Sequence, residues 1–105
     1  MANKVCTKEE VLQRLVTARS RLQAFGILRI GLFGSFARNE QGPDSDIDLL
    51  VEFSPEMHTF DNFMDANFFL EQLLGRRVEL VTPEGLSPYI GPRILQEVVH
   101  VQIAA

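Results

Sequence analysis

Hydrophobic residues near the N-terminus recur roughly every three or four positions, which is the period of an α-helix. The residues that follow this period are Val11, Leu12, Leu15, Ala18, Leu22 and Phe25. The pattern predicts a helix over residues 8–24 whose apolar side covers a core. Thr7, with Glu10 three residues later, matches a capping box at the start of this helix, and Gly26 is expected to end it.

Segments with the character of strands follow this helix, separated by residues typical of turns. Residues 28–33 and 78–82 are short apolar runs, and residues 46–53 alternate acidic with apolar side chains. Gly-Pro and Ser-Pro pairs interrupt the chain on either side of the middle segment. The sequence therefore predicts a strand in each of these segments.

Further helices are expected between and after the strands. A largely apolar, phenylalanine-rich segment predicts a core-filling helix over residues 60–74, and a short helix is expected over residues 36–40. Ser87 and Pro88 are typical of the start of a last helix. That helix would take its apolar side from Ile94, Leu95, Val98 and Val99, and the final residues to Ala105 carry no clear signal.

Asp46 and Asp48 are the first candidate functional residues. Being two apart, they project from the same face of a strand, whereas Ile47, Leu49 and Val51 project from the other face toward a core. Two carboxylates this close repel each other, and a divalent cation such as Mg²⁺ relieves that repulsion because it prefers oxygen ligands. The pattern therefore indicates a metal site, with a solvated strand face as the alternative on residue type alone.

A Gly-Ser turn directly follows the first expected strand. Gly34 has no side chain, so the backbone can approach a ligand closely there. Ser35 offers a hydroxyl where a short helix begins, and free amide groups at a helix start attract phosphate. Phosphate at this turn and a metal on the nearby carboxylates together suggest a metal–nucleotide site. A simple helix cap is the alternative role for Ser35.

The spacing of these two motifs is similar to the signature of a known enzyme superfamily. Gly34-Ser35, ten intervening residues and Asp46-Ile47-Asp48 resemble the DNA polymerase β-like nucleotidyltransferases. The small size and the sequence around both motifs resemble the minimal nucleotidyltransferases of that superfamily, and the resemblance extends to residues 78–82 and 86–90. It implies an α/β fold, a small mixed sheet with helices packed mainly on one face, in a single domain over residues 1–105.

The resemblance also implies an activity, Mg²⁺-dependent transfer of AMP from ATP to a protein acceptor. Two metal ions can align the attacking and leaving oxygens when carboxylates on rigid elements hold them. Asp46 and Asp48 are expected to bind metal, and Glu79 on the third strand is expected to assist as the third acid. The family most often has aspartate at that position, which leaves the contribution of Glu79 open.

The same resemblance indicates which residues bind the phosphates of the nucleotide. Gly34 and Ser35 would hold phosphate groups. Arg38 would reach the triphosphate, or else be a solvated surface arginine.

A partner protein is also implied by the resemblance, because a second substrate-binding domain is not expected in so short a chain. Minimal nucleotidyltransferases of this kind are commonly the antitoxin of a HEPN-family RNase toxin, and some transfer AMP to a toxin tyrosine. A HEPN toxin is therefore the expected partner, in a homo- or hetero-oligomer. The alternative is a non-catalytic antitoxin that neutralises a toxin by binding. A glycosyltransferase with Asp-x-Asp is a remote third reading, because its nucleotide-sugar domain normally needs a longer chain.

The composition of the chain limits which classes of protein it can belong to. The 105 residues are 46% hydrophobic with a net charge of −4 and show no stripe of Lys and Arg, so a small core is expected and a nucleic-acid groove is not. Cys6 is the single cysteine, which excludes an internal disulfide and is typical of a reducing cytosol. No segment predicts a membrane span or a signal peptide, so a cytoplasmic protein is expected.

The other charged residues have less specific expectations. Arg76 and Arg77 precede the third strand and are expected to form a solvated pair. Arg93 could face a nucleotide or a partner. His58 and His100 match no ligand spacing, so neither is assigned a role.

Overall fold

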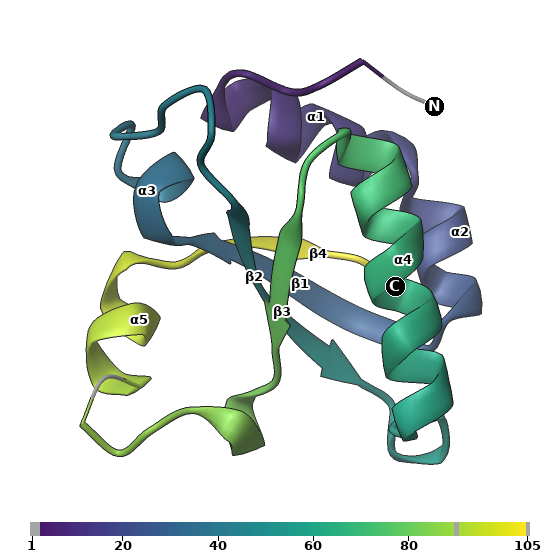
Figure 1. Cartoon of the computed structure of the whole chain (residues 1–105). Helices are drawn as coiled ribbons and strands as arrows, with labels where there is room; N and C mark the ends of the chain where they lie inside the picture. Colours follow the sequence, from purple (N-terminus) through teal and green to yellow (C-terminus); the bar gives the residue numbers. More distant parts are fainter. Residues whose placement is uncertain (1–2, 90, 105) are drawn as a thin grey trace.

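The computed structural model describes residues 3–89 and 91–104, which form a mixed four-stranded sheet with helices (Figure 1). The strands lie in the order β3-β2-β1-β4. β1 runs antiparallel to both β2 and β4, whereas β3 runs parallel to β2. Their bounds are β1 (Ile27–Phe33), β2 (Ile47–Phe53), β3 (Val78–Val81) and β4 (Val99–Gln102).

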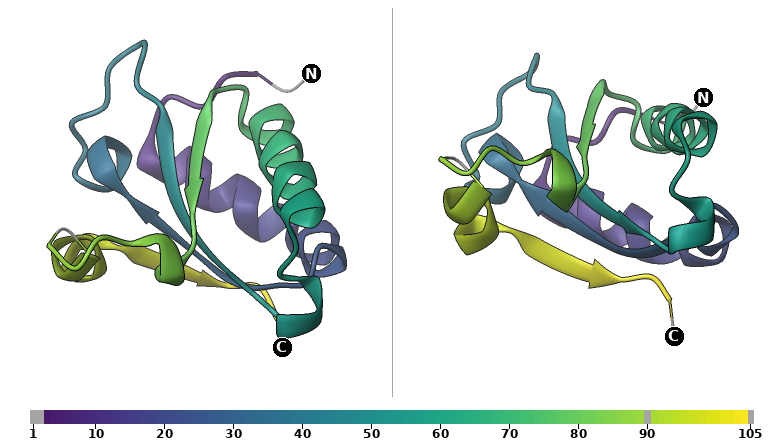
Figure 2. Two further views of the ribbon diagram at one scale, coloured as in Figure 1. Left: turned by 60° about the horizontal axis from the view of Figure 1, so that its bottom comes forward. Right: turned by 90° about the horizontal axis from the view of Figure 1, so that it is seen from below.

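The helices have different positions relative to this sheet. They are α1 (Lys8–Thr17), α2 (Arg19–Ala24), α3 (Gly34–Ala37), α4 (Phe60–Leu74) and α5 (Gly91–Glu97), with single 3₁₀ turns at Pro55–Met57 and Pro83–Gly85. The core lies where α1, α2 and α4 pack on the sheet, while α3 and α5 lie together beyond one end of it (Figures 1 and 2). The predicted small mixed sheet with helices mainly on one face is confirmed.

Side chains of β2 and β3 divide cleanly between two faces of the sheet. Ile47 and Leu49 on β2 are fully buried in the core, as is most of Leu80 on β3. The intervening Asp48 and Glu79 therefore project from the opposite face, which α1, α2 and α4 do not cover. This division sets where the candidate site lies.

Local capping explains where two of the helices begin and end. At α1, the Glu10 amide donates to Thr7 Oγ1 at 3.1 Å, so Thr7 caps the helix as predicted. Glu10 Oε1 accepts in return from the amide of Cys6 at 3.0 Å, one residue before the cap. At α4, Thr59 accepts from the Asn62 amide, and Gly75 ends the helix in the left-handed conformation.

The predicted single helix over residues 8–24 is wrong in one respect, because the structure divides it at Ala18 into α1 and α2. The Thr17 hydroxyl donates to the Gln13 carbonyl at 2.9 Å, a contact with the preceding turn that bends helices. Ala18 has φ −92° and ψ 13°, outside regular helical values. Both halves still contribute buried residues to the core, so the predicted apolar stripe is present.

The C-terminal region also departs from the prediction. The last helix was expected to include Val98 and Val99, but α5 ends at Glu97 and β4 begins at Val99. The helix was also expected to start near Pro88, but Pro88 and Tyr89 form a turn; residue 90 lies outside the described residues, and α5 is described from Gly91 onward. Val101 and Ile103 are buried while Gln102 between them is exposed, so the segment follows the two-residue period of a strand at the edge of the sheet.

Among residues 3–89 and 91–104, no helix combines the length and the apolar character that crossing a membrane requires.

Candidate functional site

The pairing of the strands brings the acidic residues of β2 and β3 side by side. Asp48 is the Cα partner of Glu79 in the parallel β2–β3 ladder and of Phe33 in the antiparallel β1–β2 ladder. Because both acids project from the face opposite the core, their carboxylates are neighbours on one surface. Asp48 is partly buried and Glu79 is exposed.

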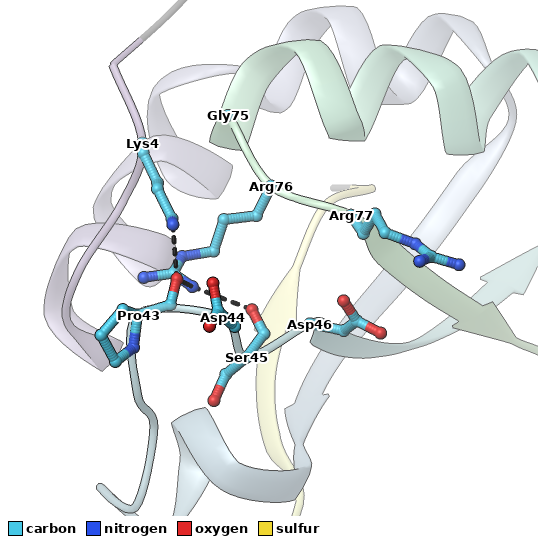
Figure 3. A pocket seen from close by; sticks show the side chains of 8 residues that line it. All are labelled: Lys4, Pro43, Asp44, Ser45, Asp46, Gly75, Arg76 and Arg77. Atoms are coloured by element: carbon cyan, nitrogen blue, oxygen red, sulfur yellow. Dashed lines mark hydrogen bonds between the residues drawn. The ribbon is translucent and has the colours of Figure 1, made fainter.

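Asp46 occupies a different position from the one expected. It lies in the loop just before β2 begins at Ile47, and its side chain is exposed. Figure 3 shows its carboxylate pointing out of the loop on the side where Arg77 extends. Within the part of the chain that the structure describes, no three His, Cys, Asp or Glu side chains gather into a ready metal-binding group. Asp46, Asp48 and Glu79 are therefore neighbours whose side chains do not converge on one point in this structure.

The electrostatics of Asp48 mark it as the most perturbed group of the site. Burial and the negative charges of Glu79 and Asp46 raise the pKa of Asp48 from 3.8 to about 6. Glu97 acts in the same direction, and only Arg38 opposes them. The negative charges of these carboxylates are therefore only partly neutralised, and a bound cation would reduce their mutual repulsion.

Gly34 joins this acidic surface to the end of β1. Its φ is +75°, in the left-handed region that favours glycine. A Cβ atom at this position would lie 2.1 Å from Asp48 Oδ2, so any other residue would displace the Asp48 side chain. The turn before Ser35 therefore packs directly against the Asp48 carboxylate, and glycine is the residue that permits this contact.

Arg38 and Glu97 form a charged cluster next to this turn. Arg38 Nε donates to Glu40 Oε1 at 2.7 Å, and Arg38 Nη1 donates to Glu97 Oε2 at 3.1 Å. The same Glu97 carboxylate accepts from the Gly34 amide through Oε1 at 3.1 Å. Hydrogen bonds to Glu40 and Glu97 raise the pKa of Arg38 above its usual value. Beside the cluster is a cavity of about 380 Å³ lined by Arg38, Arg93, Ile94 and Glu97.

Glu97 is a residue that sequence reasoning did not identify. Leu32 on β1 pairs with Val99 on β4, so continuing the antiparallel register by two residues brings Gly34 opposite Glu97. Only a correct prediction of β4 could have revealed this neighbourhood, because no local motif surrounds Glu97.

Arg76 corrects another expectation, because it is buried rather than solvated. It is 9% exposed, and Arg76 Nε donates to the Val5 carbonyl at 2.7 Å. Arg76 Nη1 donates to the carbonyls of Ser45 and Pro43 at 2.9 and 3.1 Å. Its guanidinium also lies 4.9 Å from the ring centroid of Phe36. Arg76 therefore ties three segments of the chain together through main-chain carbonyls.

The loop that Arg76 holds is the loop that leads into Asp46 (Figure 3). Lys4 also donates to the Pro43 carbonyl. The pocket between these residues has a volume of about 230 Å³ and is lined by Lys4, Pro43, Asp44, Ser45, Asp46, Gly75, Arg76 and Arg77. Ligand pockets typically exceed about 300 Å³, so this hollow is too small to hold a nucleotide by itself. Arg77 at its edge is exposed, as predicted.

Comparison with known proteins places this geometry in a family. The nucleotidyltransferase domain family matches residues 12–101. The protein adenylyltransferase MntA of Thermococcus cleftensis is 41% identical over 96 residues, which cover 90% of this chain and 96% of that protein. A solved structure described as a candidate minimal nucleotidyltransferase has a TM-score of 0.79 and 34% identity, covering 92% of this chain and 98% of its own.

More distant solved structures share the fold alone. One is a toxin–antitoxin protein crystallised with AMP-PNP, with a TM-score of 0.68, 20% identity and coverage of 85% of this chain and 70% of that one. Another comes from the toxin–antitoxin pair MntA-HepT, with a TM-score of 0.56, 18% identity and coverage of 89% and 67%.

These matches define the class of protein. The chain belongs to the nucleotidyltransferase domain family, and it is a nucleotidyltransferase. Its resemblance to the minimal members of the DNA polymerase β-like superfamily, drawn from the Gly34-Ser35 and Asp46-Ile47-Asp48 motifs, is confirmed.

Proposed function

We propose that this nucleotidyltransferase transfers AMP from ATP to a side-chain hydroxyl of a partner protein, with Mg²⁺ as its metal. The observation that carries the proposal is the contact between the Gly34 turn and the Asp48 carboxylate, because it puts a phosphate-binding candidate beside a metal-binding candidate. The adenylyltransferase name of the archaeal relative supports AMP as the group transferred.

The donor chemistry of the acidic surface fits Mg²⁺. Asp48 and Glu79 offer carboxylate oxygens from adjacent strands, and Asp46 lies two residues before Asp48. The Asp46 and Glu79 side chains would have to rotate toward Asp48 for the three to share ions, since they do not converge in this structure. Two bound ions would neutralise the charge of the triphosphate and polarise the attacking hydroxyl.

The chain's own residues have distinct roles in this proposal. Asp46 and Asp48 hold the metal, and the exposed Glu79 on the edge strand β3 accepts the proton of the acceptor hydroxyl or assists in metal binding. Gly34 and Ser35 hold phosphate oxygens at the turn, and Arg38 orients the triphosphate. With a pKa of about 6, Asp48 is mostly ionised above about pH 7, and a bound cation would favour the ionised form further.

The open face of the sheet determines from where an acceptor approaches. α1, α2 and α4 cover the core face, so a partner reaches Asp48 and Glu79 from the other side, past α3 and α5. This leaves the surface of α4, with its exposed Phe60 and Phe68, away from the chemistry. By analogy with the MntA-HepT pair, we propose that the acceptor is a HEPN-family toxin and that this chain is its antitoxin.

The test is transfer of label from ATP radiolabelled at the α-phosphate to a purified HEPN-family toxin. We expect label on the toxin with wild-type protein and Mg²⁺, and none with the Asp46→Asn, Asp48→Asn double variant. Asp44→Asn is the matched control, since it removes an exposed aspartate from the same loop and has no proposed role. Equal labelling by the double variant would contradict the catalytic assignment.

A non-catalytic antitoxin is the second candidate. Two observations favour it, the glutamate at position 79 where the family most often has aspartate, and carboxylates that do not converge. A toxin-neutralisation assay separates the two functions. Full neutralisation by the double variant would support binding alone, whereas loss of neutralisation with retained complex formation would support catalysis.

A further inference from the structure

We infer that Glu97 is a positioning residue of this enzyme, whose carboxylate holds the Gly34 turn and the Arg38 guanidinium in the arrangement that receives the phosphates of ATP. The inference rests on the proposed function and extends it to a residue outside the Gly-Ser and Asp-x-Asp motifs. Three features of the structure carry it.

The first feature is that both oxygens of one carboxylate are engaged at the turn. Oε1 accepts from the Gly34 amide at 3.1 Å, and Oε2 accepts from Arg38 Nη1 at 3.1 Å. The Glu97 side chain is 25% exposed, so these bonds are partly shielded from water. A single group therefore restrains the main chain at Gly34 and the side chain of Arg38 at the same time.

The second feature is that Glu97 lies at the junction of helix α5 and strand β4 and not in a long loop. Glu97 ends α5 and is two residues before Val99, whose partner on β1 is Leu32. Gly34 is two residues beyond Leu32, so the β1–β4 register brings the two residues opposite each other. The end of α5, directly before β4, therefore places the carboxylate at the turn.

The third feature is the ordering of Arg38, an exposed side chain with many rotamers. Nε is bonded to Glu40 and Nη1 to Glu97, while Nη2 has no hydrogen-bond partner among the described residues. Fixing this side chain before ATP arrives removes an entropic penalty from binding, because the rotamers are already restricted. The free edge of the guanidinium is then available to a phosphate group.

Nucleotide affinity tests the inference through a comparison of ATP with AMP. We expect Glu97→Ala to weaken Mg²⁺-ATP binding by about tenfold or more, as for loss of charge-assisted hydrogen bonds. AMP, which lacks the β- and γ-phosphates, should lose less than about twofold, which general misfolding could not produce. Glu97→Gln should recover part of the ATP affinity, because its amide oxygen still accepts from the Gly34 amide. Glu56→Gln, an exposed carboxylate on the 3₁₀ turn Pro55–Met57, is the matched control and should bind as wild type does.

Hydrogen exchange of the Gly34 amide tests the same inference without nucleotide. Exchange should accelerate in Glu97→Ala and remain slow in Glu97→Gln and in Glu56→Gln. Unchanged Gly34 exchange in Glu97→Ala, or ATP affinity that is equal to or tighter than that of wild type, would overturn the positioning role. A wild-type protein that fails to bind ATP while Gly34 exchange still depends on Glu97 would instead overturn the proposed function.

Discussion

Asp48 allows a quantitative test in the free protein, through the replacement Asp48→Asn. The native fold surrounds this carboxylate with Asp46, Glu79 and Glu97 and partly buries it, with Arg38 as the only opposing charge acting on it. Asparagine has nearly the same shape but no charge. The replacement therefore removes the repulsion while leaving the packing against Gly34 in place.

The size of the effect follows from the pKa. A rise from 3.8 in the unfolded chain to about 6 in the fold corresponds to about 3 kcal/mol, at about 1.4 kcal/mol for each tenfold change in proton affinity. Because Asp48 is only partly buried, solvent screening reduces this to about 1–2 kcal/mol. We expect Asp48→Asn to be more stable than wild type by that amount at about pH 7.5, and its melting temperature to be higher by about 5–10 °C.

The pH dependence has a definite sign. The folded protein binds the Asp48 proton more tightly than the unfolded chain, so wild-type stability from this group is greatest below about pH 4 and falls as the pH rises to above about 6. The variant lacks this titration. The stability difference between the two proteins should therefore be near zero below about pH 4 and reach its full value above about pH 6. Asp46, Glu79 and Glu97 are present in both proteins, so their own titration largely cancels in this difference.

Urea unfolding of both proteins across this pH range, without added metal, measures the difference directly. Asp44→Asn serves as the control for removal of one exposed charge in the same region. Added Mg²⁺ should then stabilise wild type more than Asp48→Asn, since the cation relieves the same repulsion. A variant that is equal to or less stable than wild type at about pH 7.5 would refute the electrostatic reasoning.

Three further replacements test the supporting structure. Gly34→Ala should destabilise the protein by about 1–3 kcal/mol and abolish ATP binding, because φ is +75° and the new Cβ would overlap Asp48. Urea unfolding measures the loss of stability and calorimetric titration the loss of binding. Near-native ATP binding would contradict the importance of this contact. Arg76→Lys should lower the free energy of unfolding by about 3 kcal/mol through lost hydrogen bonds to buried carbonyls, as measured by urea unfolding. Arg77→Lys should change it by less than about 0.5 kcal/mol. Similar losses from both would argue against a structural role for buried Arg76. Thr59→Ala should lower stability by about 1 kcal/mol through the lost cap of α4 and leave ATP affinity unchanged. A change in ATP affinity would show that α4 influences the site.

The sequence by itself determined several local elements and the enzyme class. The capping box at Thr7, the helix over residues 60–74 and the alternation of Ile47 and Leu49 with Asp48 depend on hydrogen bonds and side-chain periods that span only a few residues. The Gly-Ser and Asp-x-Asp motifs and their spacing could be read in the same way, and they were sufficient to indicate the nucleotidyltransferase class.

Only the tertiary structure decided which distant groups meet at the site. Glu97 reaches the Gly34 amide at the point where α5 ends and β4 begins to pair with β1, whereas the apolar spacing favoured a helix through Val98 and Val99. Arg76 is buried because main-chain carbonyls of the N-terminal segment and of the loop before β2 surround it, although its sequence neighbourhood resembles a solvated surface. The physical reason is the same in both cases. Strand register and the hydrogen bonding of buried polar groups depend on partners far apart in the chain. Short-range sequence patterns do not identify those partners.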